Sequence, residues 1–278
     1  MTAPVLVTGA TGNTGRHVVA GLLAEGIPVR AMTRDPERAA LPAGAEIVRG
    51  RTTDPEDVAA AAEGASAVYL VWPGTDDEAK GAAEVVEALG GRVPRVVYLS
   101  AQGAEEGGVW GAVETLVRRN VPEWTFLRVS GLATNTLLWV EGVRRGVVEE
   151  PFGRARRSLV HEKDVAAMAV RALVDPDHVG RAYTVTGPES IGQAEQVRVI
   201  GEVIGRETRW VEQSPEEARD GLVERVGEEF ADQLLSHWSA NVDVVEPVSQ
   251  DVPRVLGRPA LTYREWVGDH RADFAPEG

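Results

Sequence analysis

The sequence predicts an α/β protein built on a doubly wound parallel sheet, followed by a small C-terminal cap. Two observations carry this prediction. Along the first half of the chain, short apolar runs typical of buried strands alternate with amphipathic segments of helical period. Such alternation is typical of parallel βαβ units, whose right-handed crossovers place helices on both faces of one sheet. After about Leu132 the pattern changes to helical segments and loops mixed with shorter strand-like runs.

The individual elements follow from the same patterns. Strands are expected at Val5–Val7, Val29–Met32, Glu46–Val48, Ala67–Val71, Arg95–Leu99 and Thr125–Arg128. Helices are expected between them at Gly15–Ala24, Pro55–Ala62, Glu78–Leu89 and Val113–Arg119. Asp54 and Pro55 mark a helix start, because aspartate caps a helix N-terminus and proline suits its first position. Later strands are expected at Ser158–Val160, Ala182–Val185 and Arg209–Val211, and one or two helices over Pro215–Ala240.

Length and composition limit the class of protein. The 278 residues suit a single domain, with a core over about residues 1–150 and 158–187 and a cap over 188–278. The net charge of −14 argues against a nucleic-acid-binding surface, which would normally be basic. No apolar run approaches the roughly 20 residues of a membrane span, and a signal peptide's plan is lacking. We therefore expect a cytoplasmic protein without a nucleic-acid or membrane partner; a homodimer stays open.

The most specific motif is the string VLVTGATGNTG at residues 5–15. A buried strand turns through Gly9, Gly12 and Gly15 directly into a helix, which is the βα unit that holds a dinucleotide pyrophosphate. Gly9 allows the tight turn, Gly12 lets the backbone approach the phosphates, and Gly15 lets the helix lie close to the strand. The N–H groups and positive dipole end of the helix then face the anion.

The fuller string TGATGNTGRHVV resembles the NmrA-like branch of the atypical short-chain dehydrogenases/reductases. That family has a Rossmann-type fold and includes quinone reductases, dye reductases and cofactor-sensing regulators. Thr11, Gly12, Asn13 and Thr14 match its phosphate-binding loop, and residues 161–189 are similar to it as well. The resemblance covers roughly residues 3–210 and implies that the C-terminal cap is mostly substrate-binding.

The end of the second strand indicates which dinucleotide is bound. Thr33 stands where a cofactor with a free ribose would favour an acidic residue, and Arg34 follows it. A guanidinium there can pair with a 2′-phosphate, which favours NADP(H), whereas a solvated Arg34 beside Asp35 is the alternative. Arg51 stands where the family usually has aspartate; it could add to a phosphate site, stack on the base or be exposed.

Further cofactor contacts are implied by the resemblance to the family. The loop of Val71, Trp72 and Pro73 would pass along the cofactor at the end of the fourth strand. Contacts are also implied for Ser100, Ala101 and Val129, at the ends of the fifth and sixth strands.

The expected catalytic residues depart from the pattern of the wider superfamily. No Tyr-x-x-x-Lys occurs in the chain, and Trp110 and Glu114 stand at the corresponding place, after Ser100. An indole N–H is a poor proton donor, so ketone reduction that needs a positioned acid is disfavoured. Ser100 could bind a substrate oxygen, although a serine at a strand end is also typical of a local cap. Ser100, Trp110 and Glu114 are the catalytic candidates.

Tryptophans supply the candidate substrate pocket. Trp72, Trp110 and Trp139 fall where the family places its cleft, and Trp238 could join them from the cap. These tryptophans could line a pocket for a flat substrate or simply fill the core. His161 precedes Asp164 at a helix start, and this histidine is either a site residue or a structural one. The other histidines show no metal-like spacing, and the chain has no cysteine, so no metal is expected.

These inferences combine into one expectation of function. We expect an NADPH-dependent reductase that transfers hydride to a conjugated or aromatic small molecule, such as a quinone, an imine or a related natural-product intermediate of secondary metabolism. The missing Tyr and Lys leave two alternatives open, a non-catalytic NAD(P)-sensing regulator and a non-redox isomerase that uses bound cofactor.

Overall fold

The structure, a computed structural model, describes residues 3–73, 79 and 81–275. The chain divides into two compact units. The first contains the chain up to Val129 with Glu162–Val185 and Asp251–Arg258. The second contains Ser130–His161, Thr186–Gln250 and the chain from Pro259 on. No helix among the described residues combines the length and the apolar character needed to cross a membrane.

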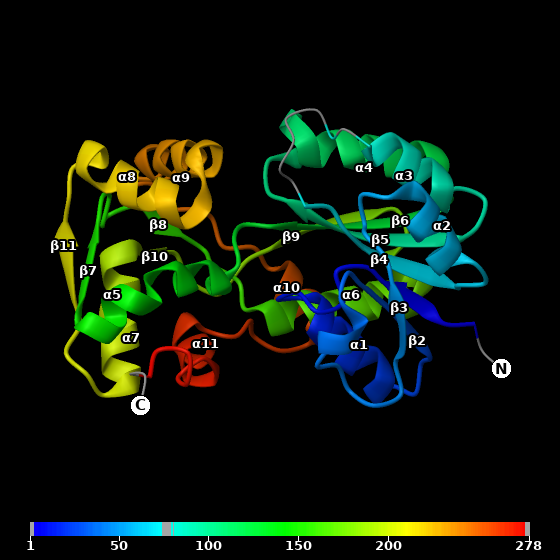
Figure 1. Cartoon of the computed structure of the whole chain (residues 1–278), viewed down its shortest axis with the longest axis horizontal. Helices are drawn as coiled ribbons and strands as arrows, with labels where there is room; N and C mark the ends of the chain where they lie inside the picture. Colours follow the sequence, from blue (N-terminus) through cyan, green and yellow to red (C-terminus); the bar gives the residue numbers. More distant parts are fainter. Residues whose placement is uncertain (1–2, 74–78, 80, 276–278) are drawn as a thin grey trace. The chain divides into compact units, whose positions relative to one another are not determined.

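A parallel sheet of seven strands forms the first unit, in the order β3-β2-β1-β4-β5-β6-β9 (Figure 1). Its strands are β1 (Val5–Val7), β2 (Val29–Thr33), β3 (Glu46–Arg49), β4 (Ala67–Val71), β5 (Arg95–Ala101), β6 (Glu123–Val129) and β9 (Arg181–Val185). Its helices are α1 (Gly15–Ala24), α2 (Pro55–Ala62), α3 (Ala82–Leu89), α4 (Gly108–Asn120), α6 (Glu162–Val174) and α10 (Asp251–Leu256), with 3₁₀ turns η1 (Pro36–Arg38), η2 (Ala104–Glu106) and η4 (Pro176–His178). Helices α1 and α6 lie together on one face of the sheet, and α2, α3 and α4 on the other (Figure 1).

This architecture confirms the predicted Rossmann-type α/β fold. The predicted bounds of β1, α1, α2 and β4 agree with the structure, and the other predicted strands of the sheet differ by one or two residues at one or both ends. Asp54 caps α2 as expected, because its carboxylate accepts hydrogen bonds from the N–H groups of Glu56 and Asp57 at 3.0 and 3.3 Å. The predicted start of α3 at Glu78 lies outside the described residues.

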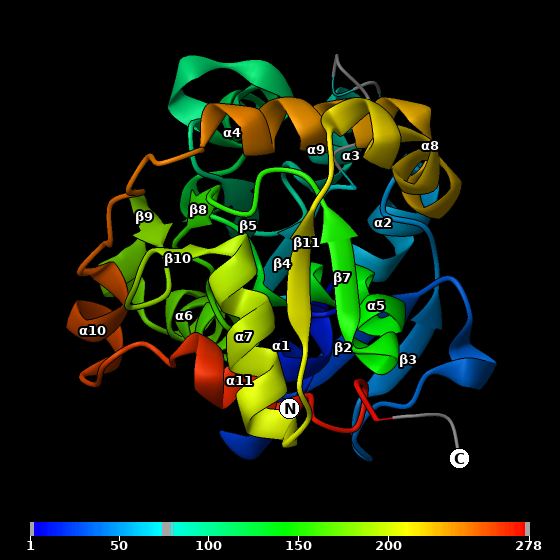
Figure 2. The same cartoon turned by 90° about the vertical axis from the view of Figure 1, so that its left-hand side faces the viewer.

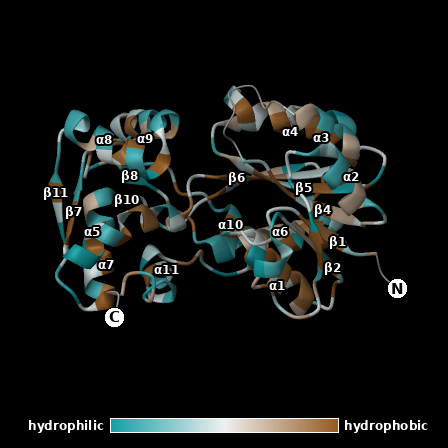
Figure 3. Ribbon diagram, viewed as in Figure 1, coloured by the Kyte–Doolittle hydropathy of each residue, from teal (hydrophilic) through white to brown (hydrophobic). Residues whose placement is uncertain are grey.

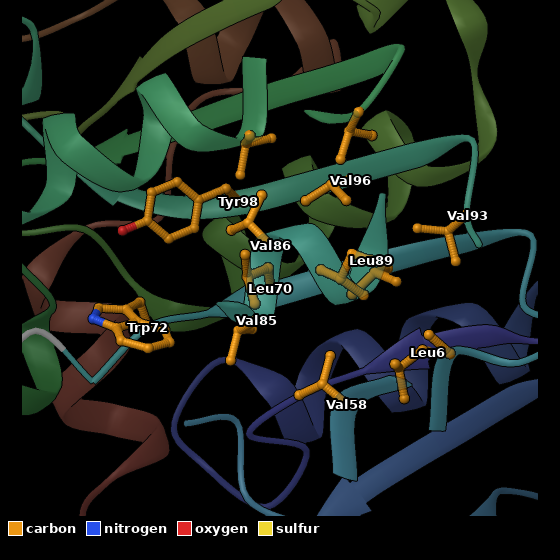
Figure 4. Packing of buried hydrophobic residues seen from close by; sticks show 14 of the residues in the cluster. Leu6, Val58, Leu70, Trp72, Val85, Val86, Leu89, Val93, Val96 and Tyr98 are labelled. Carbon is orange, nitrogen blue, oxygen red and sulfur yellow. The ribbon is translucent and has the colours of Figure 1, made fainter. Parts of the chain in front are cut away.

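The central strands consist mostly of hydrophobic residues (Figure 3), and these are buried because helices cover both faces of the sheet. On the α2–α4 face, Leu6, Leu70 and Val96 of the strands pack against Val58 of α2 and Val86 of α3 (Figure 4). All five are at most 1% exposed. Burying each such side chain contributes about 1.5–3 kcal/mol to folding, so this core holds the strand ends, and the loops that follow them, in fixed positions.

Two small sheets and five α-helices make up the described part of the second unit (Figure 2). The strands β7 (Val147–Glu150) and β11 (Arg209–Glu212) pair in parallel, and β8 (Arg156–Arg157) pairs antiparallel with β10 (Ile191–Gly192). The helices are α5 (Val140–Arg145), α7 (Gln193–Ile204), α8 (Pro215–Val226), α9 (Glu228–Ala240) and α11 (Tyr263–Asp269), with the 3₁₀ turn η3 (Ala133–Trp139).

The second unit differs from the sequence-based expectation in two places. The strand expected at Ser158–Val160 is only an isolated bridge at Val160, because the N–H and hydroxyl of Ser158 both bond to Glu246 instead of a neighbouring strand. The stretch 130–150, expected in the core, belongs to the second unit because its strand β7 pairs with β11 and not with the seven-stranded sheet.

Candidate functional site

The glycine loop after β1 has a backbone that only small residues allow. Gly9 has a φ of +58°, in the left-handed region that favours glycine, and its carbonyl accepts the Gly12 N–H at 2.9 Å. A Cβ added to Gly15 would lie 2.2 Å from that same carbonyl oxygen. The loop therefore turns as closely as the sequence predicts, and α1 begins directly behind it.

No acidic side chain lies in the first turn of α1, and the Thr14 hydroxyl makes no capping bond to the helix backbone. That hydroxyl instead accepts a hydrogen bond from the Tyr69 hydroxyl at 3.0 Å. Burial raises the pKa of Tyr69, so the phenol stays protonated and remains the donor. The positive end of the helix dipole is thus left for an anion beside Gly12, which suits a pyrophosphate.

A cavity of about 530 Å³ lies beside this loop, at the carboxyl ends of the first four strands. It is lined by Gly9, Thr11, Gly12, Met32, Thr33, Arg34, Gly50, Arg51, Thr52, Thr53, Val71 and Pro73. Among the described residues, its lining contains two arginines and no carboxylate. Ligands of open α/β sheets bind at this edge, so both the position and the charge suit the adenosine half of a phosphorylated dinucleotide.

The ends of β2 and β3 are tied together beside the cavity. Gly50 N–H donates to the carbonyl of Thr33 at 3.0 Å, and Arg49 donates to the carbonyl of Arg34 at 2.9 Å. The Thr33 hydroxyl accepts the Asp35 N–H at 3.3 Å and lies 3.4 Å from the Thr11 hydroxyl. Thr33 is thus held within the protein, while the Arg34 side chain is exposed.

A buried network of hydrogen bonds at the end of β5 joins Ser100, Glu114 and Arg128. The Ser100 hydroxyl donates to Glu114 Oε1 at 2.7 Å. Arg128 donates to both carboxylate oxygens of Glu114, from Nε at 2.9 Å and from Nη2 at 2.7 Å. Glu114 is only 3% exposed. The remaining Arg128 nitrogen, Nη1, lies 2.9 Å from the exposed Glu105 carboxylate. The hydrogen bond to the Glu114 carboxylate raises the pKa of Arg128, so the guanidinium stays charged.

This network limits what Ser100 and Glu114 can do chemically. Because the Ser100 proton points to Glu114, the serine oxygen offers only lone pairs to any other group. Both side-chain oxygens of Glu114 accept hydrogen bonds, from Ser100 and Arg128, so neither is directed at another group. Neither residue is a general acid in this arrangement. The sequence marked both residues but missed Arg128, whose only signal is a basic residue near the end of a buried strand.

Next to the network lie buried rings with unpaired polar atoms. The rings of Tyr98 and Trp110 have centroids 6.4 Å apart. The Tyr98 hydroxyl and the Trp72 indole nitrogen are buried and have no hydrogen-bond partner among the described residues, and both lie at the same end of the core (Figure 4). Burial and the nearby Glu114 charge raise the pKa of Tyr98. The alternation along β5, which puts Tyr98 and Ser100 on one face, could have identified this tyrosine.

The other candidate residues have defined local surroundings. Val71 N–H donates to the Thr8 hydroxyl at 2.9 Å, and the Val129 carbonyl accepts the Gln102 N–H, beyond Ala101, at 3.0 Å. Asn13 is exposed in the glycine loop.

The remaining three candidate residues, Trp139, Trp238 and His161, lie in the second unit. Trp139 is buried and meets Trp210 edge to face at 5.5 Å, whereas Trp238 packs in a separate small cluster with α8. His161 Nε2 lies 3.0 Å from Asp269, a contact that fits the structural reading of this histidine.

Comparisons with known proteins find relatives along nearly the whole chain. The NAD(P)H-binding family matches residues 9–176. A (4-alkanoyl-5-oxo-2,5-dihydrofuran-3-yl)methyl phosphate reductase of Streptomyces griseus is 37% identical, over 98% of this chain and 100% of the relative. An NAD(P)H azoreductase of Xenophilus azovorans is 31% identical, over 97% of this chain and 99% of the relative. The solved triphenylmethane reductase of Citrobacter sp. has a TM-score of 0.83 at 24% identity, covering 97% of this chain and 99% of its own.

Proposed function

Since the chain belongs to the NAD(P)H-binding family, as an NmrA-like oxidoreductase of the atypical short-chain type, we propose that it transfers hydride from NADPH to a conjugated or aromatic small molecule. The observation that carries this proposal is the cavity beside the glycine loop, whose described lining residues include Arg34 and Arg51 but no carboxylate. A ribose with two free hydroxyls would favour an acceptor there, whereas a 2′-phosphate favours guanidinium groups.

The surroundings of Ser100 support an acceptor that needs no acid. Ser100 and Glu114 are committed to each other and to Arg128, and the Tyr98 hydroxyl is buried. A quinone, an imine or an azo group delocalises the charge left by hydride addition over the conjugated system, so water can supply the proton afterwards. The relatives' names fit this class, because they specify an azo group and a dihydrofuranone ring.

The residues of the chain would then bind and orient the two reactants. The bound cofactor supplies the hydride. The loop of Gly9, Gly12 and Gly15 would hold the pyrophosphate, and Arg34 the 2′-phosphate. Trp72 and Trp110, both in the first unit, are the proposed aromatic contacts of a flat substrate, and Ser100 would accept a hydrogen bond from the cofactor or the substrate.

Turnover with a panel of acceptors tests the proposal. We expect NADPH oxidation with at least one quinone, azo dye or conjugated imine or lactone, and none with simple ketones, because these need a positioned acid. Tight NADPH binding without oxidation by any acceptor would favour a cofactor sensor. Conversion of a substrate without net NADPH oxidation would favour an isomerase.

Cofactor preference gives a second expected result. NADPH should bind at least about tenfold more tightly than NADH, because a charged hydrogen bond contributes about 1.5–3 kcal/mol. Arg34→Ala should weaken NADPH by a similar factor and leave NADH nearly unchanged, as measured by calorimetry. The matched control is Arg38→Ala, since Arg38 is also exposed but faces Asp35 at 3.8 Å and does not line the cavity. Equal dissociation constants in the unaltered protein would contradict the assignment.

A further inference from the structure

Arg51 is the least expected residue of the cofactor cavity. It follows β3 closely, at the position where the sequence departs from the aspartate that the resemblance implies. Because β2 and β3 are parallel neighbours, with Thr33 beside Arg49, the residues that follow the two strands leave the sheet side by side. Arg34 and Arg51 therefore lie on adjacent loops, and both line the cavity.

Hydrogen bonds of the backbone fix both arginines in place. The Arg51 N–H donates to the Asp57 carboxylate at 2.9 Å, which ties its loop to α2. The neighbouring Gly50 is close to Met32, since an added Cβ would lie 2.8 Å from the Met32 sulfur. On the other loop, Arg49 holds the carbonyl of Arg34 at 2.9 Å. Only the two side chains remain free to move toward a ligand.

Arg34 and Arg51 differ from the neighbouring arginines, which have acidic partners. Arg38 lies 3.8 Å from Asp35, and Arg49 lies 3.7 Å from Glu37. The Arg34 and Arg51 guanidinium groups have no ion-pair or hydrogen-bond partner among the described residues. Both exposed guanidinium groups are therefore available to an anion that enters the cavity.

We propose that Arg51 and Arg34 form a two-arginine clamp on the 2′-phosphate of NADPH, so that Arg51 is a second specificity-determining residue for the cofactor. This inference rests on the proposed use of NADPH. A dianionic phosphate offers oxygens to both guanidinium forks, and its charge matches the pair. Stacking of Arg51 on the adenine ring is the competing arrangement, and it would use only the planar face of the guanidinium.

Binding of adenosine nucleotides separates these arrangements without any turnover. The probes are 2′,5′-ADP and 5′-AMP, which differ only in the 2′-phosphate, and the readout is the dissociation constant from calorimetry. The variants are Arg51→Ala, Arg51→Lys, Arg34→Ala and the double alanine variant, with Arg38→Ala as the control. Because all three arginines are exposed, each variant should stay folded, and thermal unfolding checks this.

If the two arginines form the clamp, only the nucleotide that carries the 2′-phosphate should lose affinity. Arg51→Ala should weaken 2′,5′-ADP about tenfold or more and 5′-AMP less than about twofold. Arg51→Lys should retain part of the preference, and the double variant should bind the two nucleotides equally. Arg38→Ala should leave both constants unchanged.

Other outcomes overturn the clamp in distinguishable ways. An equal loss for both nucleotides in Arg51→Ala would assign the side chain to the adenine. No loss for either would make Arg51 a solvated surface residue, and a selective loss in Arg34→Ala would then show that the proposed NADPH preference stands without the clamp. If the unaltered protein itself bound both nucleotides equally, the proposed cofactor preference would fail together with the clamp.

Discussion

Gly12→Val is expected to abolish NADPH binding while the protein remains folded. Gly12 is exposed beside the cavity, and its φ lies outside the left-handed region, so a side chain there does not meet the strain of that region. Its Cβ would lie 3.1 Å from the Gly9 carbonyl oxygen, a contact that a small shift relieves. The branched side chain would then occupy the approach of the pyrophosphate. We expect the dissociation constant to rise on the order of 100-fold or more.

The control for this result is a variant with a smaller side chain at the same position. Gly12→Ala adds only the Cβ and should cost less binding than valine, with thermal unfolding close to that of the unaltered protein. Gly15 is unsuitable, because a Cβ there would lie 2.2 Å from backbone and would damage the fold itself. If Gly12→Val bound NADPH as tightly as the unaltered protein in calorimetry, the loop would not be the pyrophosphate site.

Glu114→Ala is expected to give the largest loss of stability. Glu114 is 3% exposed, and its removal would leave Arg128, itself largely buried, without its bidentate partner. Breaking a buried ion pair by removing one partner costs about 3–5 kcal/mol. Urea unfolding should therefore show a free energy of unfolding lower by that amount. Glu114→Gln should lose less, because its amide oxygen still accepts hydrogen bonds from Ser100 and Arg128.

Glu105 provides the matched control for Glu114. It also faces Arg128, at 2.9 Å, but its side chain is 55% exposed. Because exposed ion pairs contribute about 0–1 kcal/mol, Glu105→Ala should unfold nearly like the unaltered protein. Similar losses for the two alanine variants would show that the network at the end of β5 is not the buried ion pair described above.

The sequence predicted the parallel sheet well because its central strands are buried on both faces. Runs such as Val5–Val7 and Ala67–Val71 are apolar throughout, and local turn and cap residues such as Asp54 mark where the next helix begins. The glycine loop was equally predictable, since the close approach of Gly15 to Gly9 admits no side chain. These features depend on residues that are near one another in the sequence.

Features that depend on distant residues were not predictable. Arg128 reaches Glu114 across fourteen residues, from β6 to α4, and nothing in the local sequence links them. Ser158 loses its place in a strand because Glu246, 88 residues later, takes its backbone N–H. The position of Arg51 depends on distant residues in the same way. Its place on the loop next to that of Arg34 is evident only once β2 and β3 are paired.

Transfer of a labelled hydride tests the central claim most directly. The protein is incubated with a conjugated acceptor that takes the hydride at carbon, such as an imine or a lactone, and with NADPH deuterated at the transferable position of the nicotinamide ring. The product is analysed by mass spectrometry, because a deuterium on carbon does not exchange with water. We expect one deuterium in each reduced product molecule and an equal amount of NADP⁺. Product without deuterium, label that stays on the cofactor after conversion of the substrate, or no reduction at all would contradict an NADPH-dependent reductase.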